Sequence, residues 1–395
     1  MLFDCIVIGK GLIGSAAARH LSLEGKAIAI IGPDEPSSHN SNSLVYASHY
    51  DQARIQRLIG TDEIWTQLNL QSIKQYDLLQ RENNIRFHTK PGCLYVNPYG
   101  KDHYLQQASV QSDRFQIPVS FFDTALELDE SFPDFKFPAT ASAMFEPSPS
   151  GYINPRQLIC AQLSSFKKNK GIVIIDTAID IKHHNDQYEI ITHSGKAWHA
   201  KKVLLTPGAF VNFFNLTEKK LNLKLKSETI LLAKISDAEA QRLTTLPSLL
   251  YEIDEPDLKN IYLIRPVQYP DGHYYIKMGC NLPEDSYFEN LPDVQKWFTS
   301  GNSDASKEKM KNALLTIMPT LKSGEFKTSR CIITRTTHGK AYIGAIDKNL
   351  FVVAGCNGYS AMCSDALGSI ASQLIISNVF PKEYTTGAFQ PVYIN

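Results

Sequence analysis

The sequence predicts an α/β (α+β) protein with two domains, a nucleotide-binding domain built around a βαβ unit and a second domain rich in antiparallel β-strands. Near the amino terminus, residues 3–31 have the order strand, glycine loop, helix and strand. Near the carboxyl terminus, residues 350–376 have the order strand, glycine loop and helix, and from about residue 220 the chain is β-rich. A chain of 395 residues has room for two or three domains of about 150 residues each.

The amino-terminal unit begins with residues 3–8, a short apolar run rich in β-branched residues that favours a strand. A glycine loop follows it. Residues 15–24 then predict an Ala- and Leu-rich helix that Gly25 ends, and residues 27–31 predict a second buried strand. A glycine loop in this setting is typical of the Rossmann dinucleotide-binding fingerprint.

The fingerprint is the run G-K-G-L-I-G at residues 9–14. Gly9 permits the tight turn, Gly11 lets the backbone approach a pyrophosphate, and Gly14 lets helix and strand pack closely. The helix N-terminus adds amide donors and a partial positive charge. The alternative is that these glycines merely turn the chain.

One position departs from the fingerprint. An acid that binds a ribose hydroxyl is expected at the end of the second strand, about 20 residues on, but that position holds Gly32, with Asp34 and Glu35 just beyond. Asp34 either reaches the ribose from the loop or makes no such contact, and the sequence leaves both open.

The next stretch predicts two helices and three strands. A long helix is predicted over residues 62–81, with Thr61 as its cap and two acids in its first turn, and another begins at Asn154-Pro155. The predicted strands are residues 172–176, 188–192 and 203–206.

The last part of the chain predicts a hairpin and two helices. Residues 261–267 and 274–278 flank the turn sequence at 270–272 and read as the two strands of the hairpin. Residues 306–318 predict a helix that Pro319 ends. The remaining predicted elements are a strand over 350–354, a glycine loop over 355–358 and a helix over about 360–376.

Composition excludes several classes of protein. The chain has 40 Lys and Arg against 40 Asp and Glu, so no global field holds it to nucleic acid or to an anionic membrane. Its seven cysteines are scattered and include no Cys-x-x-Cys pair, so we expect no disulfide framework, no metal site and a cytoplasmic location. No apolar run approaches the roughly 18 residues that a membrane span needs, and the amino terminus has no basic region typical of a secretion signal.

Several short motifs follow the glycine loop in order along most of the chain. They are S-H-Y-D-Q-A-R-I-Q-R at 48–57, P-G-C-L at 91–94, F-E-P at 145–147, T-P-G-A at 206–209, I-K-M-G at 276–279, C-I-I-T-R-T at 331–336 and A-G-C-N-G at 354–358. Together they resemble the D-amino acid oxidase-like flavoprotein superfamily, and within it most closely the sarcosine oxidase and N-methyl amino acid oxidase group.

This resemblance implies FAD bound in a discontinuous domain, roofed by an antiparallel substrate domain. The FAD-binding domain would comprise residues 1–90, 150–218 and 322–395, and the substrate domain residues 91–149 and 219–321. The cofactor-binding residues it implies are Gly9, Gly11, Leu12, Ile13, Gly14, Asp34, Arg54, Ile179, Thr206, Gly208, Cys331, Gly355, Asn357, Gly358, Tyr359 and Met362.

Two of these features have plain alternatives. Cys331 aligns with the cysteine that in relatives forms a thioether to the 8α-methyl group of FAD, and the alternative is a free cysteine that packs as a small hydrophobe. The loop at 355–358 would point the positive end of its helix at the flavin pyrimidine edge, where it stabilises anionic reduced flavin. A plain strand-to-helix turn is the alternative.

Lys277 aligns with the lysine that the family holds beside the flavin, where it promotes reaction with O₂. Electron transfer to O₂ creates an anion, which a nearby cation in a site of low dielectric stabilises. The alternative is a solvent-facing lysine, because alternation puts Lys277 on the opposite face of its strand from Ile276 and Met278. The candidate catalytic residues are Lys277, Arg54, Arg57 and Tyr262.

The substrate clamp of the family is missing. The positions aligned with its carboxylate-binding groups hold Ile333 and Met362, and Asn281 replaces a histidine. We therefore expect an amine with a larger or aromatic body rather than sarcosine. The candidate pocket residues are His49, Tyr50, Arg265, Asn281 and Ile333, and the candidate carboxylate anchors are Arg54, Arg57 and Arg265. The alternatives are a packing role for His49 and Tyr50, a surface position for Arg265, and a surface or FAD-phosphate role for Arg54 and Arg57.

These observations predict an FAD-dependent oxidoreductase that converts the carbon–nitrogen bond of a secondary amine or amino acid to an imine, with O₂ as acceptor and hydrogen peroxide as product. One alternative is a dehydrogenase of the same fold that uses a quinone or a protein acceptor. The other is a flavin-binding subunit without activity. We expect a small-molecule substrate, no nucleic acid, and a monomer or small homo-oligomer.

Overall fold

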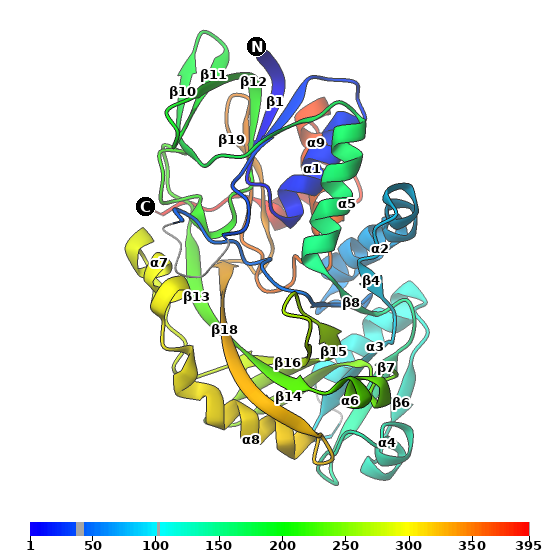
Figure 1. Cartoon of the computed structure of the whole chain (residues 1–395). Helices are drawn as coiled ribbons and strands as arrows, with labels where there is room; N and C mark the ends of the chain where they lie inside the picture. Colours follow the sequence, from blue (N-terminus) through cyan, green and yellow to red (C-terminus); the bar gives the residue numbers. More distant parts are fainter. Residues whose placement is uncertain (37–42, 101–102, 395) are drawn as a thin grey trace.

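The computed structural model describes residues 1–36, 43–100 and 103–394, which form two large sheets and one small sheet. The upper half in Figure 1 contains the first sheet and the lower half contains the second. The fold is therefore mixed α/β, as the sequence predicts.

An eight-stranded sheet forms the upper half. Its parallel centre runs β20-β12-β1-β2-β9, and the antiparallel strands β10, β11 and β19 extend it. The strands are β1 (Leu2–Ile8), β2 (Ile28–Ile31), β9 (Ile172–Ile174), β10 (Ala178–His184), β11 (Gln187–Thr192), β12 (Ala197–Leu205), β19 (Tyr342–Asp347) and β20 (Leu350–Ala354). The βαβ unit predicted at the amino terminus is thus confirmed.

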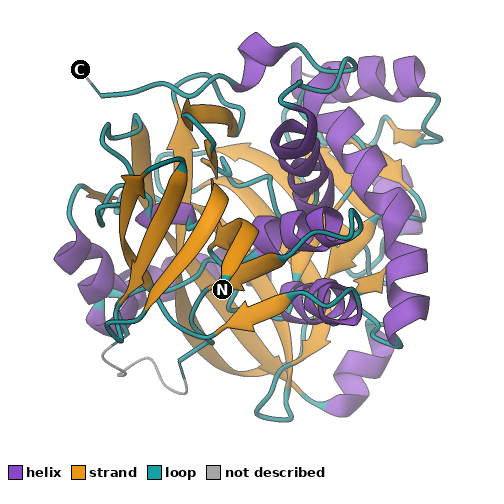
Figure 2. Ribbon diagram, turned by 90° about the horizontal axis from the view of Figure 1, so that it is seen from above, coloured by secondary structure: helices purple, strands orange, loops and turns teal. Residues whose placement is uncertain are grey.

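Helices cover one face of this sheet. They are α1 (Leu12–Ser22), α2 (Glu63–Asn83), α5 (Pro155–Lys168) and α9 (Ser364–Ser377). Val7 and Ile30 point to this face and pack with Leu21 of α1 and Leu367 of α9, whereas Ile6 belongs to a separate core on the other face. Figure 2, seen from above, shows most helices gathered to one side of the strands.

A nine-stranded, mainly antiparallel sheet forms the lower half. Its order is β17-β13-β16-β15-β14-β5-β7-β6, with β18 on the other side of β13, and only β5 and β14 pair in parallel. The strands are β5 (Cys93–Asn97), β6 (Ser120–Phe122), β7 (Ser142–Glu146), β13 (Leu223–Ile235), β14 (Ser248–Asp254), β15 (Lys259–Gln268), β16 (Tyr274–Asn281), β17 (Tyr287–Phe288) and β18 (Ser323–Thr336).

The two faces of the nine-stranded sheet have different surroundings. Leu231, Leu263 and Met278 point to one face and pack with Met310 and Leu314 of α8 in the largest core of the protein. Strand alternation sends the intervening residues to the opposite face, which looks toward the upper half. The helices of this half are α3 (His103–Phe115), α4 (Ala125–Ser131), α6 (Asp237–Arg242), α7 (Leu291–Ser300) and α8 (Lys307–Ile317).

The remaining elements are short. A three-stranded sheet joins β3 (Arg54–Gln56), β8 (Gly151–Ile153) and β4 (His88–Thr89). Single 3₁₀ turns occur at η1 (Gly208–Phe210), η2 (Ser303–Ser306) and η3 (Thr386–Phe389). Because β3 carries Arg54 and lies close to both halves, it brings the 48–57 motif to their junction.

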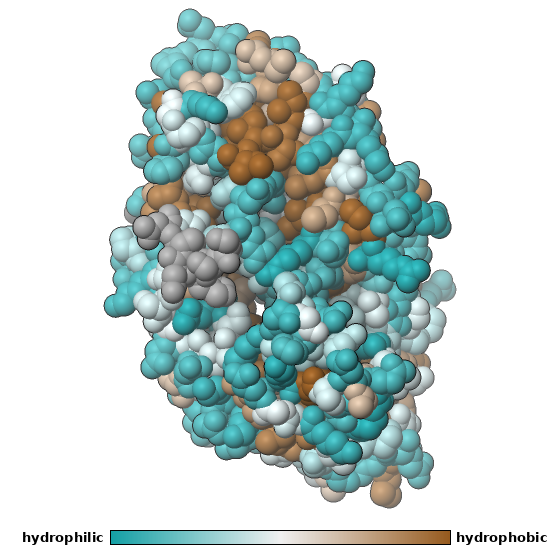
Figure 3. All heavy atoms as spheres, viewed as in Figure 1, coloured by the Kyte–Doolittle hydropathy of each residue, from teal (hydrophilic) through white to brown (hydrophobic). Residues whose placement is uncertain are grey.

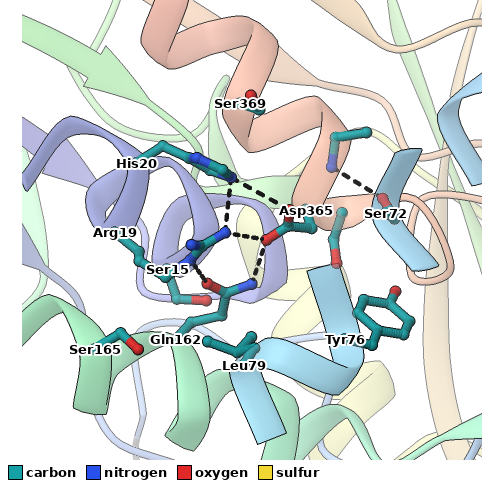
Figure 4. A network of polar contacts seen from close by, with 12 residues as sticks. Ser15, Arg19, His20, Ser72, Tyr76, Leu79, Gln162, Ser165, Asp365 and Ser369 are labelled. Atoms are coloured by element: carbon teal, nitrogen blue, oxygen red, sulfur yellow. Dashed lines mark hydrogen bonds and ion pairs between the residues drawn. The ribbon is translucent and has the colours of Figure 1, made fainter. Parts of the chain in front are cut away.

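A buried polar network ties three helices together (Figure 4). Asp365, in the first turn of α9, accepts hydrogen bonds from Arg19 Nη2 at 2.8 Å and from Gln162 Nε2 at 2.7 Å, and its other oxygen lies 3.3 Å from His20 Nε2. Burial alone raises the pKa of Asp365, but His20 and Arg19 outweigh burial and hold that pKa well below its usual value. The ionised carboxylate therefore joins α1, α5 and α9 where α9 begins.

Some predicted boundaries are wrong by a few residues. Helix α1 begins at Leu12 rather than at residue 15. The cap of α2 is Asp62, whose side chain accepts from Trp65 N, and not Thr61. Strand β9 ends at Ile174 rather than 176, and α9 begins at Ser364 rather than near 360 because residues 359–362 form turns.

The domain boundaries remain predictions, and one strand bears on them. The predicted boundary at 322 assigns β18 to the nucleotide-binding domain, whereas β18 pairs along most of β13 within the nine-stranded sheet. Figure 1 shows these two long strands side by side, running from the junction into the lower half.

Among the described residues, no helix is both long and apolar enough to cross a membrane. The face drawn in Figure 3 is largely hydrophilic, and its largest hydrophobic patch lies in the upper half.

Candidate functional site

A cavity of about 760 Å³ lies at the junction of the two large sheets. Its walls come from the glycine loop after β1, the end of β2, residues 45–57, the loop after β12, one face of the nine-stranded sheet and the turns before α9. Cavities of this size are typical of cofactor sites. The segments that the sequence motifs single out therefore meet around one space.

The three glycines of the loop face different constraints. A Cβ atom at Gly14 would lie 1.8 Å from Gly9 O, and one at Gly9 would lie 2.2 Å from Thr206 O, so the chain itself excludes side chains at both positions. A Cβ atom at Gly11 would meet only the His49 ring, with Nδ1 nearest at an ordinary 3.6 Å. The protein itself would therefore accept a side chain at position 11. The absence of one leaves room for a ligand in the cavity.

The N-terminus of α1 opens onto this cavity without a cap. Gly11 is the N-cap residue, it offers no side-chain hydrogen bond, and the first turn of α1 has no acidic residue. Such a helix end keeps free amide donors and a partial positive charge. Leu12 and Ile13 line the cavity beside it, so an anionic group fits here.

Two predicted cofactor residues do not line the cavity. Asp34 forms an ion pair with Lys10 and its side chain is 63% exposed, so its carboxylate serves Lys10 instead of the cavity. Lys10 also excludes a side chain at position 32, because a Cβ atom at Gly32 would lie 2.5 Å from Lys10 Cβ. Ile179 also lies outside the lining, since the lining segment in this part of the chain comprises residues 176–178.

The carboxyl-terminal loop lines the cavity through the left-handed conformations of Gly355, Asn357 and Gly358. Tyr359 and Met362 follow them in the lining. Helix α9 itself begins only after Met362, and the acid in its first turn is engaged in the network of Figure 4. The turns before α9, rather than its first turn, therefore line the cavity.

Lys277 is buried and held by Asp51. Its Nζ lies 2.7 Å from Asp51 Oδ2 and donates to Ala53 O at 2.7 Å. Burial, followed by the charge of Arg54, lowers the pKa of Lys277 to about 8, while Asp51 opposes this shift. The solvent-facing alternative is therefore wrong. Alternation directs Lys277 toward the junction, but Lys277 lies behind the cavity wall and is not among the residues that line it.

Asp51 also binds Arg54. Arg54 Nη1 donates to Asp51 Oδ2, and Asp51 Oδ1 accepts from Tyr269 Oη at 2.8 Å. Burial alone would raise the pKa of Asp51, but Lys277 and Arg54 hold it well below its usual value. One carboxylate thus neutralises half of the charge of two cations, and we call Asp51, Arg54 and Lys277 the cationic triad, with a net charge of about +1.

Arg57 lines the cavity without an acidic partner among the described residues. It is 3% exposed, and Nη1 donates to Tyr104 Oη at 3.0 Å. Its Cζ lies 5.5 Å from the ring centroid of Tyr95 and 5.7 Å from that of Tyr359, and Nε has no hydrogen-bond partner. A buried guanidinium in this state is well suited to bind a carboxylate.

Most predicted pocket residues lie around the cavity. His49, Tyr50, Asn281 and Ile333 line it, and so does Tyr262. Burial, and then the charges of Arg156, Arg54 and Lys10, lower the pKa of His49 to about 3. His49 is therefore a neutral group at pH 7.

Arg265 is absent from the lining. The register of β15 shifts between Ile264 and Val267, so the alternation of Tyr262 and Leu263 does not fix the direction of Arg265. Arg265 is half-buried, and its Nε is buried without a hydrogen-bond partner among the described residues. Its pocket role stays a prediction.

Cys331 lies in the cavity wall on β18. Arg54 Nη2 lies 3.6 Å from its Sγ, and Ile333 follows on the same face of the strand. Burial raises the pKa of the Cys331 thiol, and Arg54 opposes this rise.

Sequence reasoning missed Asp51, Glu228 and Arg335. Asp51 stands within the 48–57 motif, but nothing in the sequence reveals its two cationic partners. Glu228 lines the cavity from β13, and a single acid two residues before the apolar run 230–233 was the signal for it. Arg335 lines the cavity two residues after Ile333, where alternation places it on the same face.

Comparison with known proteins bears on these observations. A family model described as FAD dependent oxidoreductase matches residues 4–374. Monomeric sarcosine oxidase of Bacillus sp. (strain B-0618) is 24% identical over 387 residues, which cover 95% of this chain and 92% of that protein. N-methyl-L-tryptophan oxidase of Yersinia pestis (strain Pestoides F) is 26% identical over 213 residues, 53% of this chain and 55% of that protein.

Solved structures show the same fold. The open form of NikD, an unusual amino acid oxidase essential for nikkomycin biosynthesis, matches with a TM-score of 0.77 at 16% identity, covering 99% of this chain and 98% of that one. Glycine oxidase from Geobacillus kaustophilus matches with a TM-score of 0.72 at 16% identity, covering 98% of each chain.

The residues around the cavity fit FAD. The uncapped end of α1 offers amide donors to a pyrophosphate, and the open space at Gly11 admits one close to the backbone. The cavity continues from there to Cys331 and to the nine-stranded sheet, so one elongated group can extend between the two halves.

The contrast between Gly11 and Gly14 gives a test of this fit. We expect Gly11→Ala to fold normally but to bind FAD at least about tenfold more weakly, because the new methyl group meets ligand rather than protein. We expect Gly14→Ala to lower the melting temperature of the protein even without FAD, because its Cβ collides with backbone. Flavin content and thermal unfolding of both variants check this.

Gly387→Ala is the control, since a Cβ atom there has no neighbour within 4 Å. Full retention of FAD by the Gly11→Ala variant would contradict the assignment of this loop to the cofactor.

Proposed function

This chain belongs to the FAD dependent oxidoreductase family, and from that membership we propose that it oxidises the carbon–nitrogen bond of a secondary amine or amino acid to an imine. The observation that carries the proposal is the buried guanidinium of Arg57 on the cavity wall, without an acidic partner among the described residues. It suits a substrate that bears a carboxylate. The names of the two relatives, both oxidases of N-methylated compounds, give further support.

Bound FAD supplies the two-electron acceptor for such a reaction. The residues of this chain supply position and electrostatics. Arg57 holds the carboxylate, and Tyr262 and Ile333 contact the body of the substrate from the sheet. His49 is neutral at pH 7, and we identify no side-chain base, which suits a substrate that binds as the free amine.

The body of the substrate is larger than that of sarcosine in this proposal. Ile333 and Met362 line the cavity, and neither side chain can bind a carboxylate. They enlarge the apolar part of the wall, which favours an amine with a bulky or aromatic group.

We include O₂ as the electron acceptor, with hydrogen peroxide as product. Reduction of O₂ creates negative charge, which the cationic triad, with a net charge of about +1, would stabilise, since Arg54 lines the cavity and Lys277 lies behind its wall. A quinone or carrier protein is the alternative acceptor. A covalent thioether between Cys331 and FAD also belongs to the proposal, because Cys331 lines the cavity.

We also propose that the protein is cytoplasmic and is a monomer or a small homo-oligomer. The seven cysteines support this location, since none of them forms a disulfide.

The first prediction concerns Arg57. We expect amines that carry a carboxylate to bleach the flavin of the wild-type holoenzyme without oxygen. In Arg57→Met, we expect kcat/KM for N-methyl amino acids to fall about ten- to a hundredfold, the worth of a charge-assisted hydrogen bond. In the same variant, kcat/KM for the matching amines without a carboxylate should change less than about threefold. Stopped-flow reduction with both sets measures this.

If no amine of a broad panel bleaches the flavin, amine oxidation itself is wrong. If Arg57→Met weakens both sets equally, Arg57 supports the fold instead of holding the carboxylate.

The second prediction concerns Lys277. We expect Lys277→Met to leave anaerobic flavin reduction within about threefold of wild type and to slow reoxidation by O₂ at least about tenfold, because the cation near the developing anion is lost. Lys277→Arg, which keeps the charge, is the control. Unchanged reoxidation in Lys277→Met would refute its role, and wild-type flavin that only a quinone reoxidises would identify the alternative acceptor.

The third prediction concerns Cys331. Acid precipitation of the purified holoenzyme is expected to give a yellow pellet, and that of Cys331→Ser a colourless pellet with a yellow supernatant. A colourless pellet from wild type would exclude the thioether.

A further inference from the structure

Glu228 is a buried carboxylate in the wall of the cavity that the reaction above does not use. It lies on β13 directly opposite Cys331 of β18, and its side chain is 6% exposed. Its Oε2 accepts from Lys226 Nζ at 2.8 Å. Its Oε1 has no hydrogen-bond partner among the described residues, although Glu228 lines the cavity.

The partners of Glu228 do not balance its charge. Lys226 Nζ also binds Asp285 Oδ2 at 2.5 Å, and the three side chains are between 3% and 7% exposed. Two carboxylates therefore share one ammonium. We call Glu228, Lys226 and Asp285 the anionic triad, with a net charge of about −1, and a buried charge without compensation is costly.

The structure itself does not need Glu228 in this triad. Asp285 already pairs with Lys226 and also accepts from Leu282 N at 3.0 Å, which fixes the turn after β16. Removing Glu228 would leave Lys226 with a full ion pair. Glu228 is thus the surplus carboxylate, and it is the member of the triad that lines the cavity.

An aromatic ring lies close to Glu228. Gly279 pairs with both Tyr262 and Ile230, and a Cβ atom at Gly279 would lie 2.4 Å from the Tyr262 ring. The Tyr262 ring therefore extends from β15 across Gly279 of β16 toward β13. Burial, and next the charge of Glu228, raise the pKa of Tyr262 well above its usual value, which agrees with this proximity.

Asn281 completes the surroundings. It lines the cavity two residues beyond Gly279, and its Oδ1 accepts from Arg335 Nη2 at 3.4 Å. The carboxylate of Glu228, with one oxygen that has no partner among the described residues, and the ring of Tyr262 are groups that attract a cation. The charge of Lys277 also lowers the pKa of Glu228, but less than Lys226 does, and Asp51 shares that charge.

We propose that Glu228 binds a second, positively charged group of the substrate amine, an ammonium or guanidinium, so that the substrates are diamines or basic amino acids. This inference rests on the proposed function of the same cavity. Arg57 and Glu228 then bind opposite charges at two places in one cavity, and the apolar wall at Ile333 contacts the chain between them. Burial raises the pKa of Glu228 while Lys226 opposes the rise, and a bound cation would favour the ionised form.

The test compares two substrates with the same carbon skeleton, using the holoenzyme. Nα-methyl-L-lysine carries a terminal ammonium, and Nα-methyl-L-norleucine lacks this ammonium and ends in a methyl group. We expect wild type to have a kcat/KM about ten- to a hundredfold higher for the lysine derivative. In Glu228→Gln, which keeps the shape and loses the charge, we expect this preference to disappear while kcat/KM for the norleucine derivative stays within about threefold.

A binding measurement makes the test independent of turnover. Methylguanidinium offers the cation without an oxidisable amine, and calorimetric titration is expected to show that it binds wild type and binds Glu228→Gln at least about tenfold more weakly. If Glu228→Gln does not fold, the substrate ratio and the titration of wild type decide alone.

The outcomes separate the two proposals. If wild type oxidises both derivatives equally and does not bind methylguanidinium, the cation site is refuted and amine oxidation stands. If neither derivative bleaches the flavin and methylguanidinium binds at Glu228, the cation site stands and the amine reaction fails for this class.

Discussion

The close contact between the glycine loop and the end of β12 is the constraint on which the rest of the site depends. Gly9 and Gly14 have no room for a side chain, and Thr206 Oγ1 donates to Ile8 O and Gly9 O at 2.9 and 3.0 Å. This contact fixes the start of α1 at the edge of the sheet, so its uncapped amides meet the cavity. The polar network around Asp365 holds the same helix from behind, against α5 and α9.

The nine-stranded sheet supplies the other wall because its two faces differ. One face is apolar and packs on α8 in the largest core, while the opposite face carries the charged and polar residues of the cavity. Alternation along each strand produces this division without any loop insertion. The strands are rigid elements, so they can hold Tyr262, Glu228 and Cys331 in fixed positions relative to the glycine loop.

Two charged clusters with opposite net charge meet this cavity. The cationic triad shares one carboxylate between two cations, and the anionic triad shares one ammonium between two carboxylates. Each leaves about one charge uncompensated in a poorly solvated region, where electrostatic interactions are strong. Arg57 adds a further cation in the wall. A substrate with charges of both signs would satisfy these groups better than a small neutral amine.

The sequence by itself determined the βαβ unit, the glycine loop, the hairpin at 270–272 and the family, because turn residues and strand or helix periodicity act over a few neighbouring positions. It also identified Arg54, Arg57 and Lys277 as charged candidates. Only the tertiary structure decided which of them are paired with an acid and which of them line the cavity. Asp51 pairs with Lys277 across 226 positions in the chain (277 − 51), Arg57 has no acidic partner among the described residues, and Arg265 does not line the cavity. Ion pairs of this kind depend on which strands become neighbours in the folded chain, and local sequence patterns do not predict this.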